Sequence, residues 1–237
     1  FAGGSGSISF YANYSEFSRN AISVGVGLSS SAFGGIPIKV LNNTFTNLAV
    51  GGYFDYGYFE KNSFSSASGG GSVIKQSALS VGSNAVVINT SIISGGRHGL
   101  GFLGKNATVE NVTITCGSNG GVYTRYCIYF SDDSNNNILK GAKFSSIIQH
   151  GIGLSGTSPS LNVNNNLVID TNFTTPSGTD VVFLGFTQDN VFLNVTYGDA
   201  ESNSGSGNIY NVRKWYYQAK VQNYSGSPLN NVLINDT

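Results

Sequence analysis

The chain has 237 residues, enough for one large or elongated domain, and its 12 basic and 12 acidic residues leave no net charge at neutral pH. Charged residues make up only 10% of the chain, which argues against electrostatic binding to nucleic acid or anionic lipid. Gly, Ser, Thr and Asn together make up about 46%, yet the 40% hydrophobic content separates the chain from disordered polar tracts. No run approaches ~18 consecutive apolar residues, so we expect no membrane span within this chain.

The first recurring element in chain order is a hexapeptide that begins and ends with an apolar residue. It occurs as VLNNTF, FEKNSF, VINTSI, VENVTI, LKGAKF, VIDTNF and FLNVTY. Its closing residues are Phe45, Phe64, Ile92, Ile114, Phe144, Phe173 and Tyr197, and Phe17 fits as an earlier member. Consecutive closing residues of the seven hexapeptides are 19 to 30 positions apart. Such a recurrence indicates a repeat protein, and we expect these residues to stack in one continuous core.

A second apolar row follows the first after a short and nearly constant interval. Its members are Tyr53, the run around Val73, Leu100, Ile128, Ile152, the run around Val182, and Ile209. Two rows joined by loops of variable length predict a coil with at least two strands per turn. Helical periodicity is not sustained, and a propeller blade would need ~40–45 residues and four strands, so a parallel β-helix is favoured.

The NNTF, INTSI, ENVTI and HGIGL segments resemble repeats of the right-handed parallel β-helix of the pectate-lyase-like class. They are most similar to the NosD-like, carbohydrate-binding-and-hydrolase repeats of secreted and archaeal surface proteins. The resemblance covers roughly residues 5–212 and implies an all-β solenoid of about seven to eight coils over residues 1–212. The motif is degenerate, so it indicates the fold more specifically than the activity.

The position three residues before each closing residue is occupied by residues suited to a bend. It holds Asn42, Lys61, Asn89, Asn111, Gly141, Asp170 and Asn194. Because Asn, Asp and Gly adopt the left-handed backbone conformation most readily, we expect a bend there in every coil. Two arrangements of the asparagine side chains are open: they can stack inside the coil as a hydrogen-bonded ladder, or they can point outward.

Nine Asn-x-Ser/Thr sequons occur along the chain. They begin at Asn13, Asn42, Asn89, Asn106, Asn111, Asn172, Asn194, Asn223 and Asn235. With 28 Asn and about a fifth of the residues Ser or Thr, roughly six sequons would arise by chance, so the excess is small. If the bend asparagines form an internal ladder, glycans are expected chiefly at Asn13, Asn106, Asn172 and Asn223. If they point outward, all nine sequons are available.

The two histidines of the chain lie in the similar segments RHGLGF and QHGIGL. Aligned by the second row, one position holds Arg97, Arg125 and Gln149, and the next holds His98, Tyr126 and His150. A metal site and one structural turn seen twice are the competing interpretations. Stacked strands lie ~4.8 Å apart, so histidines two coils apart should be about 10 Å apart and cannot share a metal through ~2.1 Å bonds. We therefore expect a structural turn and no metal.

The same six positions offer arginine, aromatic and imidazole groups along one solvent face. Such a face could bind an acidic or neutral glycan, with Arg97, His98, Arg125, Tyr126, Gln149 and His150 as the contact residues. The alternative is that these side chains are solvated turn residues without a ligand.

Cys116 and Cys127 bracket an insertion of about six residues that precedes Ile128. Joining them would tie the longer loop to its coil and stabilise the fold by at most a few kcal/mol. A loop-pinning disulfide is therefore favoured over two free thiols. A zinc or redox motif is not expected, because there is no C-x-x-C spacing and no further cluster of ligands.

Asp132 and Asp133 form the only pair of adjacent acidic residues in the chain. The resemblance implies a polysaccharide lyase or a glycoside hydrolase as one class of activity, with Asp132, Asp133, Arg97 and Arg125 as catalytic candidates. Lyases of this fold use a calcium site of several Asp or Glu and an Arg or Lys base, and hydrolases use two or three carboxylates ~5–9.5 Å apart. Both neighbouring coils place a glycine at the position aligned with Asp132, so no third acid is available, which favours a protein that is not an enzyme.

Residues 213–237 depart from the repeat. The apolar residues Trp215, Tyr217, Ala219 and Val221 recur at every second position, and a Ser-Gly-Ser-Pro turn follows, which predicts a β-hairpin. The GSPLNNV segment is similar to the opening of Ig-like or carboxypeptidase-regulatory-like sandwich domains. Since a sandwich needs about seven strands, the hairpin is either the start of a truncated sandwich or a cap on the open end of the β-helix.

Together these features predict an extracellular or cell-surface structural or adhesive module, such as part of a surface layer, filament or adhesin. The low charge, the Tyr-, Asn-, Gly- and Ser-rich composition, the sequons and the lack of a dense catalytic cluster support this interpretation. The expected partners are carbohydrate or neighbouring surface-protein subunits, and neither nucleic acid nor a cofactor is expected. The alternative is a polysaccharide lyase or glycoside hydrolase of the β-helix class.

Overall fold

The computed structural model of the protein describes most of the chain. The described residues are 8–10, 16–23, 28–30, 38–48, 52–54, 56–66, 77–94, 98–116, 126–146, 149–172, 178–196, 201–204, 209–216 and 224–227. They form 25 β-strands and contain no helix, so none of them belongs to a helix that could cross a membrane.

The strands assemble into three parallel sheets. Sheet B contains β1 (Ile8–Phe10), β4 (Leu28–Ser30), β7 (Gly52–Phe54), β10 (Ser77–Val81), β13 (His98–Phe102), β16 (Tyr126–Phe130), β19 (His150–Gly156), β22 (Val181–Gly185) and β24 (Glu201–Asn203). Sheet C contains β2 (Glu16–Ser18), β5 (Ile38–Leu41), β8 (Gly57–Glu60), β11 (Val86–Ile88), β14 (Thr108–Glu110), β17 (Ile138–Lys140), β21 (Leu167–Ile169) and β23 (Thr187–Leu193), with β20 (Val163–Asn164) and β25 (Ile209–Lys214) also paired to β23. Sheet A contains β3 (Ala21–Ser23), β6 (Thr44–Leu48), β9 (Ser63–Ser66), β12 (Ser91–Ser94), β15 (Thr113–Cys116) and β18 (Lys143–Ser146).

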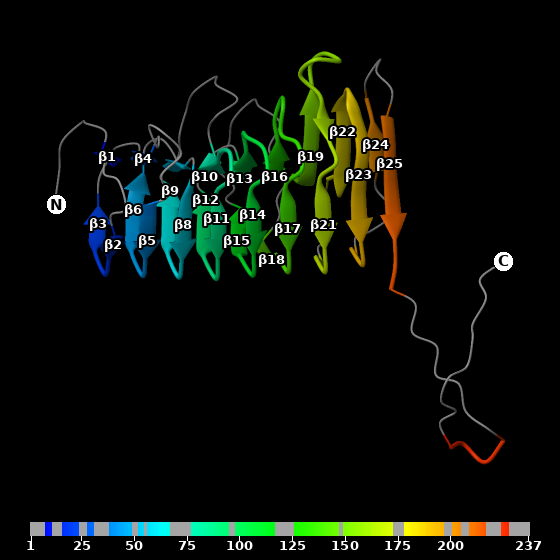
Figure 1. The fold of residues 1–237 in the computed structure, drawn as a ribbon, viewed down its shortest axis with the longest axis horizontal. Coiled ribbons are helices and arrows are strands. Elements are labelled where there is room, and N and C mark those ends of the chain that lie inside the picture. Colours follow the sequence, from blue (N-terminus) through cyan, green and yellow to red (C-terminus); the bar gives the residue numbers. More distant parts are fainter. Residues whose placement is uncertain are drawn as a thin grey trace.

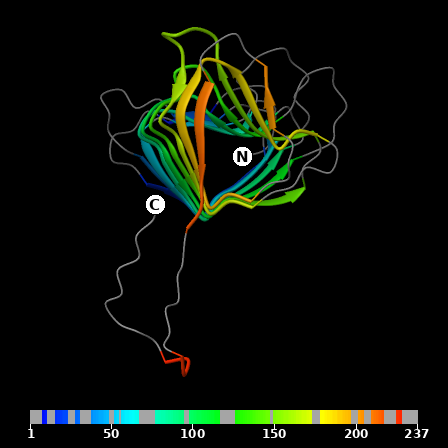
Figure 2. The same ribbon diagram turned by 90° about the vertical axis from the view of Figure 1, so that its right-hand side faces the viewer.

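From β1 to β18 the chain visits the sheets in a fixed rotation, B then C then A, and each round stacks on the one before it. From β19 to β25 the described strands belong to sheets B and C, and isolated bridges from Lys143 to Asn172 and from Asn172 to Thr196 extend the stack of sheet A. Figure 1 shows this stack from the side, facing sheet C, and Figure 2 looks along it, with the three sheets as three sides around a shared interior. We number these rounds coils 1 to 9 in chain order, from β1 in coil 1 to β24 and β25 in coil 9. The rotation gives three strands per coil in coils 1 to 6, one more than the minimum of two expected from the sequence, and the arrangement is compatible with a parallel β-helix.

The interior is built from columns of apolar side chains, one per sheet. The column of sheet C is Val40, Phe59, Val87, Val109, Leu139, Val168 and Phe192, each at most 2% exposed. The column of sheet A is Ile22, Phe45, Phe64, Ile92, Ile114 and Phe144, paired in register from coil to coil. In the five hexapeptides that close at Phe45 to Phe144, the first and last residues therefore belong to two different sheets, and a bend lies between them.

The expected stacking of the closing residues is confirmed for the five from Phe45 to Phe144, while Phe173 and Tyr197 lie outside the described residues. The assignment of Phe17 to this row is wrong. Phe17 pairs with Val40 in sheet C, and Ile22 precedes Phe45 in sheet A, because the bend falls between the two strands of coil 1.

The second expected row corresponds to sheet B and is correct at its centre. The residues Leu79, Leu100, Ile128, Ile152 and Val181 are in register in this sheet. Tyr53 and Val182 are each one residue away from that column, Val73 lies outside the described residues, and Ile209 belongs to β25 in sheet C. Counting from the previous row fails there because the intervening loops differ in length.

The core column yields a direct test. Ile114→Asp would place a carboxylate in a fully buried position with no cationic partner, and we expect it to lower the free energy of unfolding by about 4 kcal/mol or more. Ile93→Asp is the matched control, since Ile93 lies on the outer face of the same sheet and is 43% exposed, and it should change stability by less than about 0.5 kcal/mol. Urea unfolding followed by circular dichroism measures both, and equal effects would contradict the assigned core.

Candidate functional site

The residues that the sequence aligned around the histidines do stack on sheet B. His98 pairs with Tyr126, and Tyr126 pairs with His150, in three successive coils. The ring centroids of His98 and Tyr126 are 5.6 Å apart, and those of Tyr126 and His150 are 5.4 Å apart. A tyrosine ring thus separates the two imidazoles, and the two histidines occupy equivalent positions two coils apart, as the sequence alignment placed them. The described residues include no group of three or more His, Cys, Asp or Glu that could hold a metal ion.

Burial changes the interpretation of this row. His98 is 2% exposed and Tyr126 is 5% exposed, so these two residues do not lie on the solvent face that the sequence suggested. Tyr129 packs over both, with its ring centroid 4.7 Å from that of His98 and 5.4 Å from that of Tyr126. A Cβ atom at Gly153 would lie 2.6 Å from the Tyr126 ring, so glycine is needed for this ring to lie against the sheet. His150 is half-buried and Gln149 is exposed, while Arg97 and Arg125 lie outside the described residues.

Both imidazoles are tied to the backbone of the following coil. Nδ1 of His98 accepts the backbone N–H of Tyr126 at 3.2 Å, and Nδ1 of His150 accepts that of Thr179 at 3.2 Å. A nitrogen that accepts a hydrogen bond carries no proton, so each ring holds its proton on Nε2 when it is neutral. Burial lowers the pKa of His150 below its ordinary value of 6.5.

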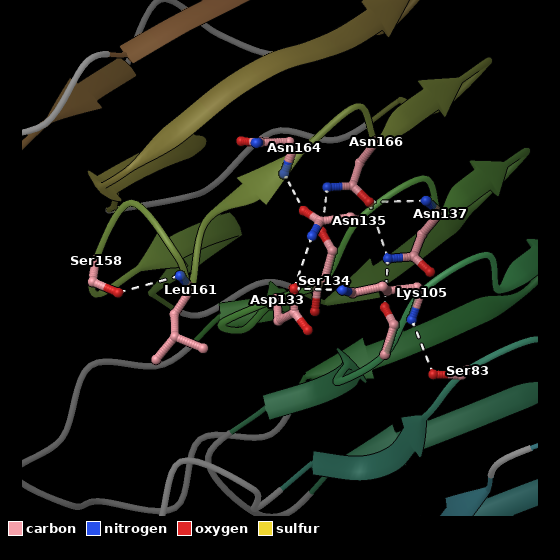
Figure 3. Close-up of polar contacts among 11 residues, drawn as sticks. Ser83, Lys105, Asp133, Ser134, Asn135, Asn137, Ser158, Leu161, Asn164 and Asn166 are labelled. Carbon is pink, nitrogen blue, oxygen red and sulfur yellow. Dashed lines mark hydrogen bonds and ion pairs between the residues drawn. The ribbon is translucent and has the colours of Figure 1, made fainter.

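The two aspartates engage different coils. Asp132 accepts the backbone N–H and the hydroxyl of Thr157, at 2.7 and 3.1 Å. Asp133 pairs with Nζ of Lys105 at 2.8 Å and accepts the side-chain amide of Asn135 at 3.0 Å, as Figure 3 shows. Adjacent in sequence, the carboxylates therefore serve as separate links between neighbouring coils. The observed geometry does not join them into a catalytic pair.

The bends follow the sequence expectation closely. All seven residues expected to be left-handed are so, with φ between 50° and 63°. They form one column at the corner between sheets C and A, which Arg19 begins in coil 1. A second left-handed column lies at the corner between sheets B and C and was not expected. It consists of Tyr56, Asn84, Asn106, Asn136, Asn165 and Asp189.

The internal asparagine ladder exists, but at the residue after the bend. Asn42, Asn89 and Asn111 are exposed and Asn194 is partly exposed, whereas Asn43 and Asn62 are buried and hydrogen-bonded to each other. The left-handed residue turns the chain, so its own side chain points out and the next side chain points in. The alternative in which the sequon asparagines themselves form the ladder is therefore wrong.

A longer internal ladder follows the second column of bends and was missed by the sequence analysis. It consists of Asn137, Asn166, Asn190 and Asn211 in coils 6 to 9. The side chain of Asn166 donates to the Ser134 carbonyl oxygen at 2.7 Å and to Oδ1 of Asn190 at 2.9 Å. Its Oδ1 accepts both the backbone N–H and the side-chain amide of Asn137, at 2.9 and 3.0 Å. Figure 3 shows the Asn137–Asn166 step of this ladder. The two NNN runs at residues 135–137 and 164–166 were the available signal in the sequence.

The geometry of the first corner also explains the frequency of sequons. Four sequons begin at left-handed residues of this corner, and their Ser or Thr is two residues later, at or beside the outward first position of a sheet A strand. The bend selects Asn and an exposed strand position favours Thr or Ser. The small excess over chance therefore follows from the fold itself. A sequon can carry a glycan only if its asparagine is exposed, and Asn106 and Asn172 are exposed as well.

Cys116 and Cys127 form a disulfide, with their Cα atoms 5.6 Å apart. It joins the end of β15 to β16 and closes the insertion noted in the sequence. A disulfide is typical of proteins that fold in an oxidising compartment.

Comparison of the chain with protein-family models, with curated proteins and with solved structures found no match.

The internal ladder can be tested at its centre. Asn166→Ala would leave the backbone N–H of Asn137 and the side-chain amide of that residue without their acceptor, and we expect a loss of about 2–4 kcal/mol in the free energy of unfolding. Asn165→Gly is the neighbouring control, because Asn165 is exposed and its φ of 54° suits glycine, so its effect should stay within about 0.5 kcal/mol. A smaller loss for Asn166→Ala than for the control would contradict the assigned network.

The imidazole at position 150 predicts a pH dependence of stability. Since its pKa is lowered by folding, the unfolded chain binds this proton more readily, and stability falls as the pH decreases below about 6.5. Protonated Nδ1 could also no longer accept the N–H of Thr179. Urea midpoints measured between pH 7.5 and 5 should decline less for His150→Gln than for the wild type. Identical declines in the two proteins would show that the His150 imidazole does not contribute to the pH dependence of stability.

Proposed function

We propose that the chain is an extracellular structural or adhesive module, built as a right-handed parallel β-helix of the pectate-lyase-like class. In this proposal residues 1–212 form the β-helix, and residues 213–237 form a terminal hairpin that caps it or begins a sandwich domain. The observation that carries the proposal is the use of the polar site residues as links between coils. Asp132, Asp133, His98 and His150 each bond to a residue of an adjacent coil.

The proposed environment is the cell surface. The disulfide supports an oxidising compartment, and stacked coils held by buried ladders suit a rigid, protease-resistant unit. Carbohydrate contact would involve the exposed Gln149 and the half-buried His150, together with Arg97 and Arg125. Neighbouring surface-protein subunits are the other proposed partners.

Surface shaving tests the proposal in the source organism. Protease treatment of intact cells should release peptides of this chain, while a cytosolic marker protein stays intact. In parallel, purified protein incubated with a panel of acidic and neutral polysaccharides should generate neither unsaturated products nor new reducing ends. Catalytic turnover that is abolished by the Asp132→Asn, Asp133→Asn double variant would establish the alternative, a lyase or glycoside hydrolase.

Glycan occupancy is a further prediction of the surface location. Because the corner asparagines are exposed, we expect glycans at one or more of Asn42, Asn89, Asn111 and Asn194 in addition to Asn106 and Asn172. Asn89 and Asn111 lie in adjacent coils ~4.8 Å apart, so crowding should keep most molecules from carrying both. Glycopeptide mass spectrometry of natively expressed protein measures occupancy at each site. Material with every sequon unmodified would remove glycosylation from the proposal.

A further inference from the structure

The apolar columns of the core end together in the last coil. In sheet B two columns run through coils 4 to 8, and the register of β24 continues both into coil 9. In chain order they are Leu79, Leu100, Ile128, Ile152 and Val181, and Val81, Phe102, Phe130, Leu154 and Phe183, all at most 4% exposed. The next residue of the first column is Glu201, and the next residue of the second column is Asn203.

Sheet C changes in the same coil. Its core column is apolar from Val40 to Phe192, and the register of β25 places Arg213 next to Phe192. Glu201, Asn203 and Arg213 are exposed, whereas Phe192 in coil 8 is only 2% exposed. Figure 2 views the stack from the end at which β24 and β25 lie. Three columns that change from apolar to polar within one coil indicate a common cause at this end of the stack.

The opposite end of the stack shows that an end coil need not be polar. In coil 1 Phe17 occupies the core column of sheet C, and Ile22 occupies that of sheet A and is 5% exposed. Phe17 stacks on Phe45 of coil 2, with the ring centroids 6.4 Å apart. The apolar columns of these two sheets therefore include the first coil, and the change to polar residues is a property of coil 9.

The asparagine ladder also turns back in coil 9. Asn211 accepts the side-chain amide of Asn190 at 2.7 Å, and its own amide donates to Oγ1 of Thr187 at 3.2 Å. Both partners lie in coil 8. In coils 6 and 7, by contrast, the side-chain amides of Asn137 and Asn166 each donate to the asparagine of the following coil. The described side-chain hydrogen bonds of Asn211 thus all point back into the stack.

We propose that coil 9 is a built-in stop, which keeps the last strands of the stack from pairing with a strand of another molecule. β24 and β25 are the outermost strands of sheets B and C at this end, and an outermost strand offers backbone N–H and C=O groups to a further strand. Short edge strands and charged residues at inward positions protect such an edge. Both devices are present, since β24 has three residues and Glu201 and Arg213 occupy core positions.

The residue types explain how the stop covers the core without extending it. A strand added to coil 9 would bury the carboxylate of Glu201 and the guanidinium of Arg213 between two coils, and removing charges from water is strongly unfavourable. Arginine can cover apolar surface with its aliphatic stem while its charged group stays in water. The guanidinium of Arg213 lies 5.0 Å from the centre of the half-exposed Trp215 ring. Coil 9 thus closes the core and presents charge at its open edge.

The stop assigns the closure of this end to residues 201–214, which precede most of the segment considered above as a cap. It follows from the register of these residues alone and is independent of the cell-surface role. Its consequence for assembly is that copies of this protein do not join through this end of the β-helix.

Small-angle X-ray scattering of the full chain at increasing concentration tests the stop. The triple variant Glu201→Val, Asn203→Phe, Arg213→Phe repeats in coil 9 the residues that coil 8 has in the three columns. We expect it to self-associate at least about tenfold more tightly than the wild type, because its open edge is apolar. The longest dimension of the particle should increase while its cross-section stays that of one β-helix, as end-to-end joining requires.

The double variant Ser202→Val, Lys214→Phe is the matched control. Its positions lie on the same two strands but are paired with the outward residues Val182 and Leu193, so it adds apolar side chains outside the columns. It should associate as the wild type does. If the triple variant does not fold, as thermal unfolding would show, Arg213→Leu replaces it and should also associate more tightly than the wild type. A decapped variant that associates no more tightly than the wild type, or a control that associates equally tightly, would overturn the proposal.

Discussion

The described residues of coils 3 to 8 all bend at the same two corners, because strands can stack in parallel register only if the chain turns in the same way each time. The turn is made by one residue in the left-handed conformation, with φ between 48° and 63° throughout both corner columns. The bends are integrated into the hydrogen bonding of the stack, since the backbone N–H of Asn89 donates to the carbonyl oxygen of Glu110 in the next coil. This pairing offsets the cost of about 1–2 kcal/mol that a residue such as Tyr56 or Lys61 incurs in that conformation.

The bends also determine the environment of the next residue, whose side chain points into the coil. A side chain there is buried beside backbone groups that no strand can pair, so it must either be small and apolar or make those hydrogen bonds itself. In coils 4 and 5 this residue is small and apolar, namely Ala85 and Ala107. In coils 6 and 7 it is Asn137 and Asn166, whose side chains make these hydrogen bonds. The amide group suits the task because it is both donor and acceptor, and can therefore link the coils on either side. The ladder thus replaces a strand pairing that the corner interrupts.

The sequence was sufficient for the bends between sheets C and A and for the core column of sheet A from Phe45 to Phe144, because both depend on residue type at a fixed distance from an apolar residue. It was insufficient for the number of strands per coil. The two apolar ends of a hexapeptide such as VINTSI look alike, and only the bend between them shows that Val87 and Ile92 lie in different sheets. It was also off by one residue for the ladder, since the alternation of inward and outward side chains does not continue through a left-handed residue.

The sequence predicted which residues of the candidate site align with one another, but it did not predict that His98 and Tyr126 are buried. His98, Tyr126 and His150 share a row because the register of sheet B is constant, so this alignment could be found by counting residues along the sequence. The covering of His98 by Tyr129 could not be predicted, because the repeat does not determine the direction in which a ring leans along the sheet. In a stack of coils the core and corner positions are constrained by the fold and can be recognised in the sequence. The conformation of outward side chains is not constrained by the stacking, so their contacts had to come from the structure.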